Sequence, residues 1–204
     1  MLPLVVLARH GETAWSLAGR HTGRTDLPLT AAGEAAARRL RERLASIAFA
    51  QVRTSPSQRA RRTCEIAGCG AHAVVDPDLA ECDYGDYEGL TTGEIVARRP
   101  GWSLFRDGCP GGEAPADVAA RADRVVARAR DAGGGVLLVS SAHILRTVAA
   151  RWLDLPAGGG RHFVLDTASV SVLGCEHTAD EPVIRSWNDA ACAAMPLATR
   201  DGTG

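Results

Sequence analysis

The sequence predicts an α/β fold: a three-layer sandwich with a mostly parallel central sheet, an antiparallel edge and helices on both faces. Short β-branched apolar runs, such as residues 4–7 and 136–140, alternate with segments of helical periodicity. This alternation is typical of a parallel sheet covered by helices. The last two apolar runs, around 168–174 and 182–187, follow each other without a helix between them. They predict an antiparallel pair at one end of the sheet.

The first half of the chain contains two strand–helix units. A strand over residues 4–7 runs into a turn at 8–12, and a helix with a capping threonine follows over 30–46. A second strand around Val52 stops at a Ser-Pro pair, and a second helix begins near Arg59. Because chemistry in such folds lies at the carboxyl ends of strands, the residues just after the first strand are the first candidates for a site.

The second half begins with a short strand over residues 73–75. Residues 77–115 are rich in glycine, proline and aromatic side chains, so we expect a loop-rich insertion that covers the site, with one short helix over 92–99. The α/β pattern then resumes with a helix, a strand and a helix, expected over 117–131, 136–140 and 144–153.

Length, charge and cysteine usage exclude several classes of protein. A chain of 204 residues fits a single domain over 1–204. The net charge of −1 gives no overall field to attract nucleic acid or an anionic membrane. No apolar run approaches the roughly 20 residues that span a bilayer; with no secretory pattern at the start, we expect a cytoplasmic protein. Six scattered cysteines without a C-x-x-C pair predict free thiols and no metal centre.

Arg9 and His10, at the end of the first strand, have the chemistry of an anion site. A guanidinium group can bind two phosphate oxygens, and its charge keeps a neighbouring imidazole neutral and therefore nucleophilic. A structural arginine–carboxylate pair beside a core histidine would explain the same two residues. Position alone leaves both interpretations open.

Residues 7–16, LARHGETAWS, resemble the signature of the histidine phosphatase superfamily, which includes the phosphoglycerate mutases. Further segments resemble later blocks of that family in the same order. They are Thr22-Gly23, residues 26–30, residues 55–60 with Thr63, residues 81–89 and residues 110–113. The resemblance covers residues 4 to about 174 and implies the α/β fold of that family.

This resemblance implies a phosphomonoesterase that acts on a small phosphorylated metabolite through a phosphohistidine intermediate. His10 would attack phosphorus, while Arg9 and Arg59 would neutralise charge on the phosphoryl oxygens. Glu81 matches the proton donor of the family, which protonates the leaving alcohol. Composition does not separate Arg59 or Glu81 from their charged neighbours, so the motif alone selects them. No metal and no other cofactor is implied.

The resemblance also suggests residues that contact the phosphate or the group that carries it. Ser16, Thr22 and Gly23 match such positions. The family often has asparagine where Ser16 stands, and a serine side chain reaches less far.

Residues 137–146, LLVSSAHILR, contain a larger departure from the family, which usually has Ser-His-Gly at this strand end. Ser141 occupies the place of the second catalytic histidine, and Ala142 that of the glycine. Losing one hydrogen-bond donor in a catalytic site typically costs roughly 100- to 1000-fold in rate. His143, two residues on, either replaces the missing imidazole in part or is a helix-start histidine near the pocket.

Ser141 therefore leaves three explanations open: a weak phosphatase, a protein recruited to another reaction or to ligand binding, and an engineered inactive variant. The change at Ala142 argues against a single engineered substitution. The leading hypothesis is a phosphatase, with an altered or non-hydrolytic family member as the alternative. A phosphoglycerate-type mutase is less favoured, because such mutases generally have a longer insertion than residues 90–115. The substrate is not identified, and a homodimer is an open option.

Overall fold

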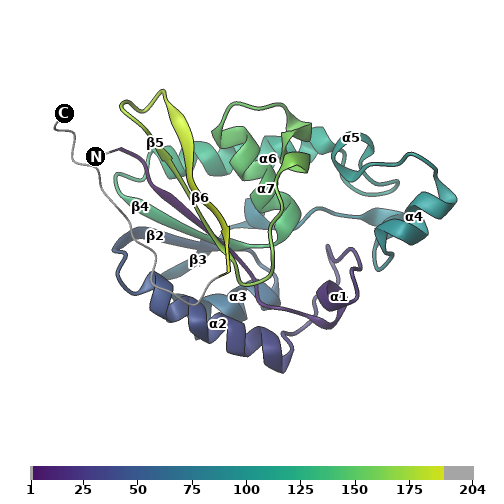
Figure 1. Ribbon diagram of the computed structural model, residues 1–204, viewed down its shortest axis with the longest axis horizontal. Helices are drawn as coiled ribbons and strands as arrows, with labels where there is room; N and C mark the ends of the chain where they lie inside the picture. The colour runs from purple at the N-terminus through teal and green to yellow at the C-terminus, as the bar shows by residue number, and fades with distance from the viewer. Residues whose placement is uncertain (1, 191–204) are drawn as a thin grey trace.

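The computed structural model describes residues 2–190 and contains a six-stranded sheet between two layers of helices (Figure 1). The strand order is β3-β2-β4-β1-β5-β6. The first four of these are mutually parallel, whereas β5 runs antiparallel to both β1 and β6. The strands are β1 (Val5–Arg9), β2 (Phe49–Thr54), β3 (Ala73–Val75), β4 (Gly135–Ser140), β5 (Val170–Cys175) and β6 (Pro182–Asp189). This arrangement confirms the predicted mostly parallel sheet with an antiparallel edge.

Helices cover both faces of the sheet, as Figure 1 shows. Helices α2 (Ala31–Leu44) and α3 (Gln58–Ile66) cover one face, and α6 (Pro115–Arg130) and α7 (Ala142–Trp152) cover the other. The short helices α1 (Ala14–Leu17), α4 (Thr92–Arg98) and α5 (Leu104–Asp107) lie beyond the sheet. Val5 and Leu7 of β1 join a core with α6 and α7, while Val6 and Ala8 join a core with α2 and α3. Since side chains alternate along a strand, both faces of β1 are buried, which explains its uninterrupted apolar run.

Helix boundaries follow local capping chemistry. Thr30 is the N-cap of α2, where its side chain accepts a hydrogen bond from the Gly33 N–H at 3.0 Å. Helix α6 begins at Pro115, two residues before the expected start. Proline suits a first helical turn because that turn has no intrahelical use for the missing N–H. The Asp117 carboxylate accepts the N–H of Ala114 and closes this end.

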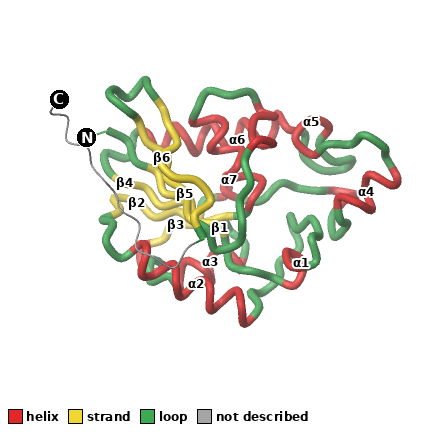
Figure 2. Tube along the Cα trace, in the orientation of Figure 1, coloured by secondary structure: helices red, strands yellow, loops and turns green. Residues whose placement is uncertain are grey.

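The segment over residues 77–115 consists mainly of loops with short helices, as Figure 2 shows. Besides α4 it contains α5 and the 3₁₀ turns Pro77–Leu79 and Gly85–Tyr87. The expectation of one short helix was therefore too low, because a four-residue helix is too brief to produce a periodic pattern. Among residues 2–190, none of the helices combines the length and the apolar character needed to cross a bilayer.

Candidate active site

The candidate site lies where β1 and β4 end side by side. Arg9 is paired with Ser140 in the parallel register, and the His10 N–H donates to the Ser140 carbonyl at 2.9 Å. His10 and Ser141 are therefore the next residues of two neighbouring strands, at the carboxyl edge of the sheet. This is the edge at which ligands bind in open α/β sheets.

The His10 imidazole is buried and oriented by one hydrogen bond. Its Nδ1 lies 2.7 Å from the Gly11 carbonyl oxygen, which can only accept, so we assign the ring proton to Nδ1. The lone pair of Nε2 is then available. Burial, followed by the positive charges of Arg9 and Arg59, lowers the pKa of His10 well below its usual value. The ring is thus neutral near pH 7, as a nucleophile requires.

Two glycines let the first turn of α2 touch the loop that follows His10. A Cβ on Gly11 would lie 2.5 Å from the Gly33 carbonyl oxygen. In the other direction, a Cβ on Gly33 would lie 2.2 Å from the Glu12 carbonyl oxygen. Neither glycine can carry a side chain without moving backbone, so this loop is fixed by contact with α2.

The same loop is tied to α3 through one hydroxyl group. The Gly11 N–H donates to Thr63 Oγ1 at 3.0 Å, and the Thr63 hydroxyl donates to the Arg59 carbonyl at 2.7 Å. Thr63 therefore sets the position of the His10 loop relative to the helix that carries Arg59.

Arg59 is a buried cation whose donors contact the loop over residues 22–25 and the end of β4. Its Nη1 donates to the Thr25 carbonyl at 3.1 Å, and its Nη2 donates to the carbonyls of Thr22 and Gly23 at 3.0 and 3.3 Å. Nε and Nη2 also each donate to Ser141 Oγ at 3.3 Å. One edge of the guanidinium group therefore holds the Ser141 hydroxyl.

Arg9 supplies a second positive charge. Its Nη1 donates to the Leu165 carbonyl, while its buried Nε has no hydrogen-bond partner within the described residues. Burial lowers the pKa of Arg9, and the nearby charge of Glu81 opposes that change. An unpaired buried N–H is unfavourable by about 1–3 kcal/mol, and an oxygen of a bound anion would remove that penalty.

Glu81 is held at the N-terminus of α7 by three backbone donors. Its Oε1 accepts from the N–H groups of Cys82 and Ile144 at 2.8 and 3.0 Å, and its Oε2 accepts from that of His143 at 3.0 Å. Helix N-termini present their free N–H groups to negatively charged partners. Glu81 and Ser141, which is the N-cap of α7, are consequently positioned by the same helix end.

Two further carboxylates and an arginine support this arrangement, and sequence reasoning missed all three. Glu88 accepts from the Gly23 N–H at 2.9 Å and so holds the loop that Arg59 contacts. Glu113 accepts from the Asp83 N–H at 2.9 Å and forms an ion pair with Arg121 at 2.8 Å. Both glutamates lie in segments that resemble the family, residues 81–89 and 110–113, and this resemblance could have identified them. Arg121 lies in α6 and has no local motif.

The His143 ring packs in the core beside the site. It stacks on Phe105, with ring centroids 4.2 Å apart and an interplanar angle of 12°. Burial, followed by the charge of Arg146, lowers the pKa of His143 to about 3. Its contact with Glu81 uses the backbone N–H, and its Nδ1 is buried without a partner in the described part of the chain. The ring is thus fixed by stacking, near the site, at the second position of α7.

Among the expected contacts, Ser16 uses its hydroxyl in a local capping interaction. Its hydroxyl donates to the Thr13 carbonyl at 3.0 Å and accepts from the Thr13 N–H at 2.8 Å, as part of a capping box on α1. An asparagine or serine at such a position has a competing local use as a cap.

Thr22, Gly23 and Ala142 lie in the backbone around the site. Thr22 and Gly23 present their carbonyls to Arg59, whereas the Thr22 hydroxyl donates to the Arg20 carbonyl at 3.0 Å. A Cβ on Gly23 would lie 2.3 Å from the Cys82 carbonyl oxygen, so only glycine fits there. Ala142 is the first residue of α7.

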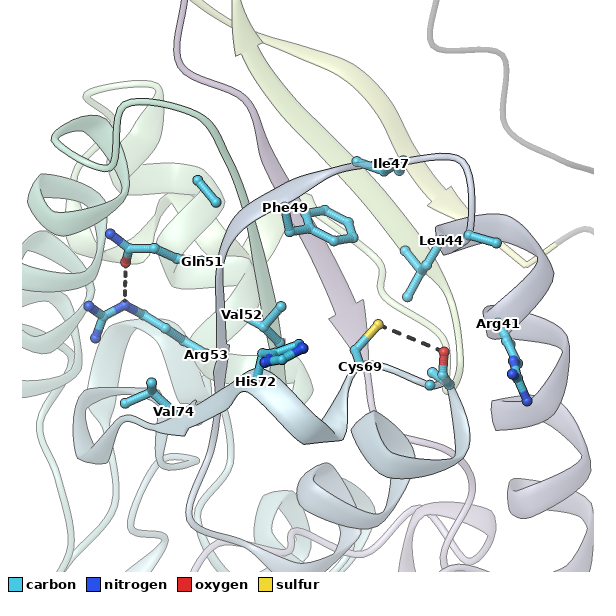
Figure 3. A pocket seen from close by; sticks show the side chains of 14 residues that line it. Arg41, Leu44, Ile47, Phe49, Gln51, Val52, Arg53, Cys69, His72 and Val74 are labelled. Atoms are coloured by element: carbon cyan, nitrogen blue, oxygen red, sulfur yellow. Dashed lines mark hydrogen bonds between the residues drawn. The ribbon is translucent and has the colours of Figure 1, made fainter.

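Two hollows differ in their relation to these residues. One of about 400 Å³ is bordered by Glu81, Gly23 and Arg121, and so adjoins the cluster. A larger one of about 680 Å³ lies between β2, β3 and the carboxyl ends of α2 and α3 (Figure 3). Leu44, Phe49 and other residues unrelated to the cluster line it. The larger hollow is therefore not the one that adjoins the site residues. Within residues 2–190, no group of three or more His, Cys, Asp or Glu side chains is arranged to hold a metal ion.

Comparisons with known proteins find relatives that match most of the chain. The chain is 42% identical over 177 residues to an acid phosphatase of Mycobacterium tuberculosis, a match that covers 85% of this chain and 87% of the relative. It is 33% identical to the sedoheptulose 1,7-bisphosphatase of Saccharomyces cerevisiae, covering 76% of this chain and 69% of that protein.

Solved structures also resemble this chain over most of its length. The structure of an open reading frame product of Mycobacterium tuberculosis superposes with a TM-score of 0.87 at 39% identity, covering 91% of this chain and 97% of that chain. A mycobacterial glucosyl-3-phosphoglycerate phosphatase superposes with a TM-score of 0.79 at 27% identity, covering 92% and 99%. A profile of the histidine phosphatase superfamily, branch 1, matches residues 5–190. The chain therefore belongs to the histidine phosphatase superfamily.

Proposed function

We propose that this protein is a phosphomonoesterase that hydrolyses a small phosphorylated metabolite through a phosphohistidine on His10. The observation that supports this most directly is the state of the His10 ring. It is neutral, the proton assigned to Nδ1 leaves the Nε2 lone pair available, and two arginines lie close enough to lower its pKa. The same two cations can balance the charge of the phosphoryl group that Nε2 attacks.

The reaction proceeds in two displacements. Nε2 of His10 attacks phosphorus, the bond to the leaving oxygen breaks, and Glu81 gives that oxygen a proton. Water then attacks the phosphohistidine, Glu81 takes a proton from it, and phosphate leaves. Arg9 and Arg59 hold the phosphoryl oxygens in both steps. The hollow bordered by Glu81 is where we place the leaving group.

The substrate class rests on relatives whose names describe phosphatases of sugar phosphates and phosphoglycerate derivatives. We extend only their common chemistry, a phosphate monoester on a small polar molecule, to this chain. A cytoplasmic location and a homodimer stay predictions.

Phosphate release tests the proposal, with two arginines of α3 as a matched pair. Arg59 is buried in the site, whereas Arg61 is exposed on the same helix. Across a panel of phosphomonoesters we expect Arg59→Ala to lower kcat/KM by roughly 100-fold or more and Arg61→Ala to leave it unchanged. An equal loss of kcat/KM in both variants, or no turnover of any ester by the wild type, would refute the proposed activity.

One observation favours a second candidate, a family member that binds a phosphorylated ligand without hydrolysing it. Ser141 occupies the Nε and Nη2 edge of Arg59 and brings no positive charge. Calorimetric titration with inorganic phosphate, combined with single-turnover assays, separates the two candidates. Phosphate binding with no phosphoenzyme and no turnover would establish the second one.

A further inference from the structure

Two cysteines lie close together beside the proposed proton donor. Cys82 directly follows Glu81, and Cys109 opens the turn over residues 109–113. The Cys82 thiol donates a hydrogen bond to the Asp83 carbonyl at 3.6 Å, and both side chains belong to the same buried cluster, close enough for each to shift the pKa of the other. Both are free thiols. The proposed mechanism uses neither of them.

Backbone hydrogen bonds hold the two cysteine-bearing segments next to each other. The Glu113 N–H donates to the Asp83 carbonyl at 2.9 Å, and the Asp86 N–H donates to the Pro110 carbonyl at 2.8 Å. The segments are so close that a Cβ on Gly112 would lie 2.2 Å from the Asp83 carbonyl oxygen. The two cysteines therefore lie close together because the loop segments that follow them are joined by two hydrogen bonds.

The two thiols are not equivalent. The Cys82 side chain lowers the pKa of Cys109, whereas the Cys109 side chain, followed by burial, raises the pKa of Cys82. Cys109 is also the more accessible, at 8% exposed against 1% for Cys82. Cys109 is thus suited to react first with a small oxidant, with Cys82 as its resolving partner.

We propose that Cys82 and Cys109 are a reversible oxidation site, which hydrogen peroxide converts to a disulfide that lowers the activity of the enzyme. The Cys109 thiolate attacks one peroxide oxygen and the O–O bond breaks, leaving a sulfenic acid and a hydroxide that takes a proton to become water. The Cys82 sulfur then attacks the sulfenic sulfur. The S–S bond forms, the S–O bond breaks, and the hydroxyl leaves with the Cys82 proton as a second water. A dithiol reductant returns both thiols by exchange.

The bond would act on the site through Cys82. A disulfide holds its sulfurs about 2.05 Å apart, closer than any hydrogen-bonded pair of thiols, so Cys82 moves toward the turn at Cys109. The Cys82 N–H holds Glu81 Oε1, and its carbonyl packs against Gly23. This effect rests on the proposed function, in which Glu81 is the proton donor. Because a shift of about 1 Å in a catalytic geometry can lower a rate by about 100-fold, we expect kcat to fall at least tenfold, with KM changed less.

Four forms of the full-length protein test the site: wild type, Cys82→Ser, Cys109→Ser and the control Cys69→Ser. Cys69 is a partly exposed thiol of raised pKa that lines the distant hollow. Each form is treated with hydrogen peroxide, digested without reduction and mapped by mass spectrometry. Phosphate release is assayed before oxidation, after oxidation and after subsequent treatment with dithiothreitol. We expect the Cys82–Cys109 peptide pair, and a loss of kcat that dithiothreitol reverses, in wild type and Cys69→Ser only.

Each alternative outcome has a separate meaning. Oxidation without a Cys82–Cys109 peptide pair would overturn the site itself. A bridge that forms while kcat stays constant would overturn its effect on activity, and so would equal inactivation of Cys109→Ser. Failure of the reduced wild type to release phosphate would instead contradict the proposed function, and the peptide map would still decide whether the bridge forms.

Discussion

Strands β1 and β4 end side by side, yet the residues that follow them differ in chemistry. After β1, His10 presents a neutral imidazole oriented by the Gly11 carbonyl. After β4, Ser141 presents a hydroxyl that accepts two hydrogen bonds from Arg59. The half of the site that carries the proposed nucleophile is therefore formed, while the opposite half has a short neutral hydroxyl where the resemblance implies an imidazole.

This difference separates the fold from the chemistry. The register that pairs Arg9 with Ser140 and the contacts of Glu81 with the start of α7 are formed with a serine at position 141, where the resemblance implies an imidazole. A serine can still give its proton to a phosphate oxygen while Arg59 binds its lone pairs, but it adds no charge. The fold thus accommodates serine at position 141, whereas we expect the rate of phosphate release to be lower than with histidine there.

The largest effect is expected at His10, because its replacement would remove the proposed nucleophile. His10→Ala should lower kcat by more than about 1000-fold, because no other group in the cluster is placed to form the covalent intermediate. Rapid-quench trapping should show an acid-labile phosphoenzyme in the wild type and none in the variant. The exposed His72 provides the control, since His72→Ala should retain full activity. A phosphoenzyme in His10→Ala would place the nucleophile elsewhere.

Glu81→Gln comes next in size, since general acid catalysis contributes roughly 100- to 10,000-fold. The glutamine keeps the size of the side chain but removes the proton that the leaving group needs. The loss should therefore be large for alkyl phosphates and small for p-nitrophenyl phosphate, whose leaving group is stable without a proton. The two substrates serve as each other's control. An equal loss on both would assign Glu81 a positioning role.

Ser141→His directly tests the part of the site that follows β4. We expect kcat to rise by about 10- to 100-fold, a little less than such a donor contributes in a site adapted to it. Ser141→Asn, a neutral donor of similar size, is the matched control and should give little of that gain. Steady-state kinetics on the best wild-type substrate measure both. A fall in activity with histidine would mean that the site is adapted to serine.

The smallest expected effect concerns stability and the third residue of the β4 end, His143. Its pKa is about 3 when folded and about 6.5 when unfolded, so below pH 6.5 the unfolded chain binds a proton that the folded chain does not. Stability therefore falls as the pH drops, by about 2 kcal/mol between pH 7 and pH 5 from this group alone.

Urea unfolding at both pH values measures this contribution. His143→Gln should be less sensitive to pH than the wild type by about that amount, whereas His72→Gln, at an exposed position, should match the wild type. An unchanged pH dependence in His143→Gln would mean that the ring is protonated in the fold.

The sheet, its antiparallel edge and the helices α2, α3, α6 and α7 could be predicted from apolar periodicity and capping residues, because these signals are local. The cluster of His10, Arg9, Arg59 and Glu81 came from motif resemblance, and the structure brings them together. The role of Ser16 in a capping box and the support from Arg121 could not be predicted. Both depend on which acceptor lies nearest after folding, and no spacing rule encodes that.

The back-to-back contact of Gly11 and Gly33 has a consequence for anyone who tries to stabilise this protein. A glycine in the first turn of a long helix is an obvious target, since alanine there ordinarily improves helix stability by up to about 1 kcal/mol. At Gly33 the added methyl group would lie 2.2 Å from the Glu12 carbonyl oxygen and push on the loop after His10. Thermostabilising design should therefore leave this helix start untouched.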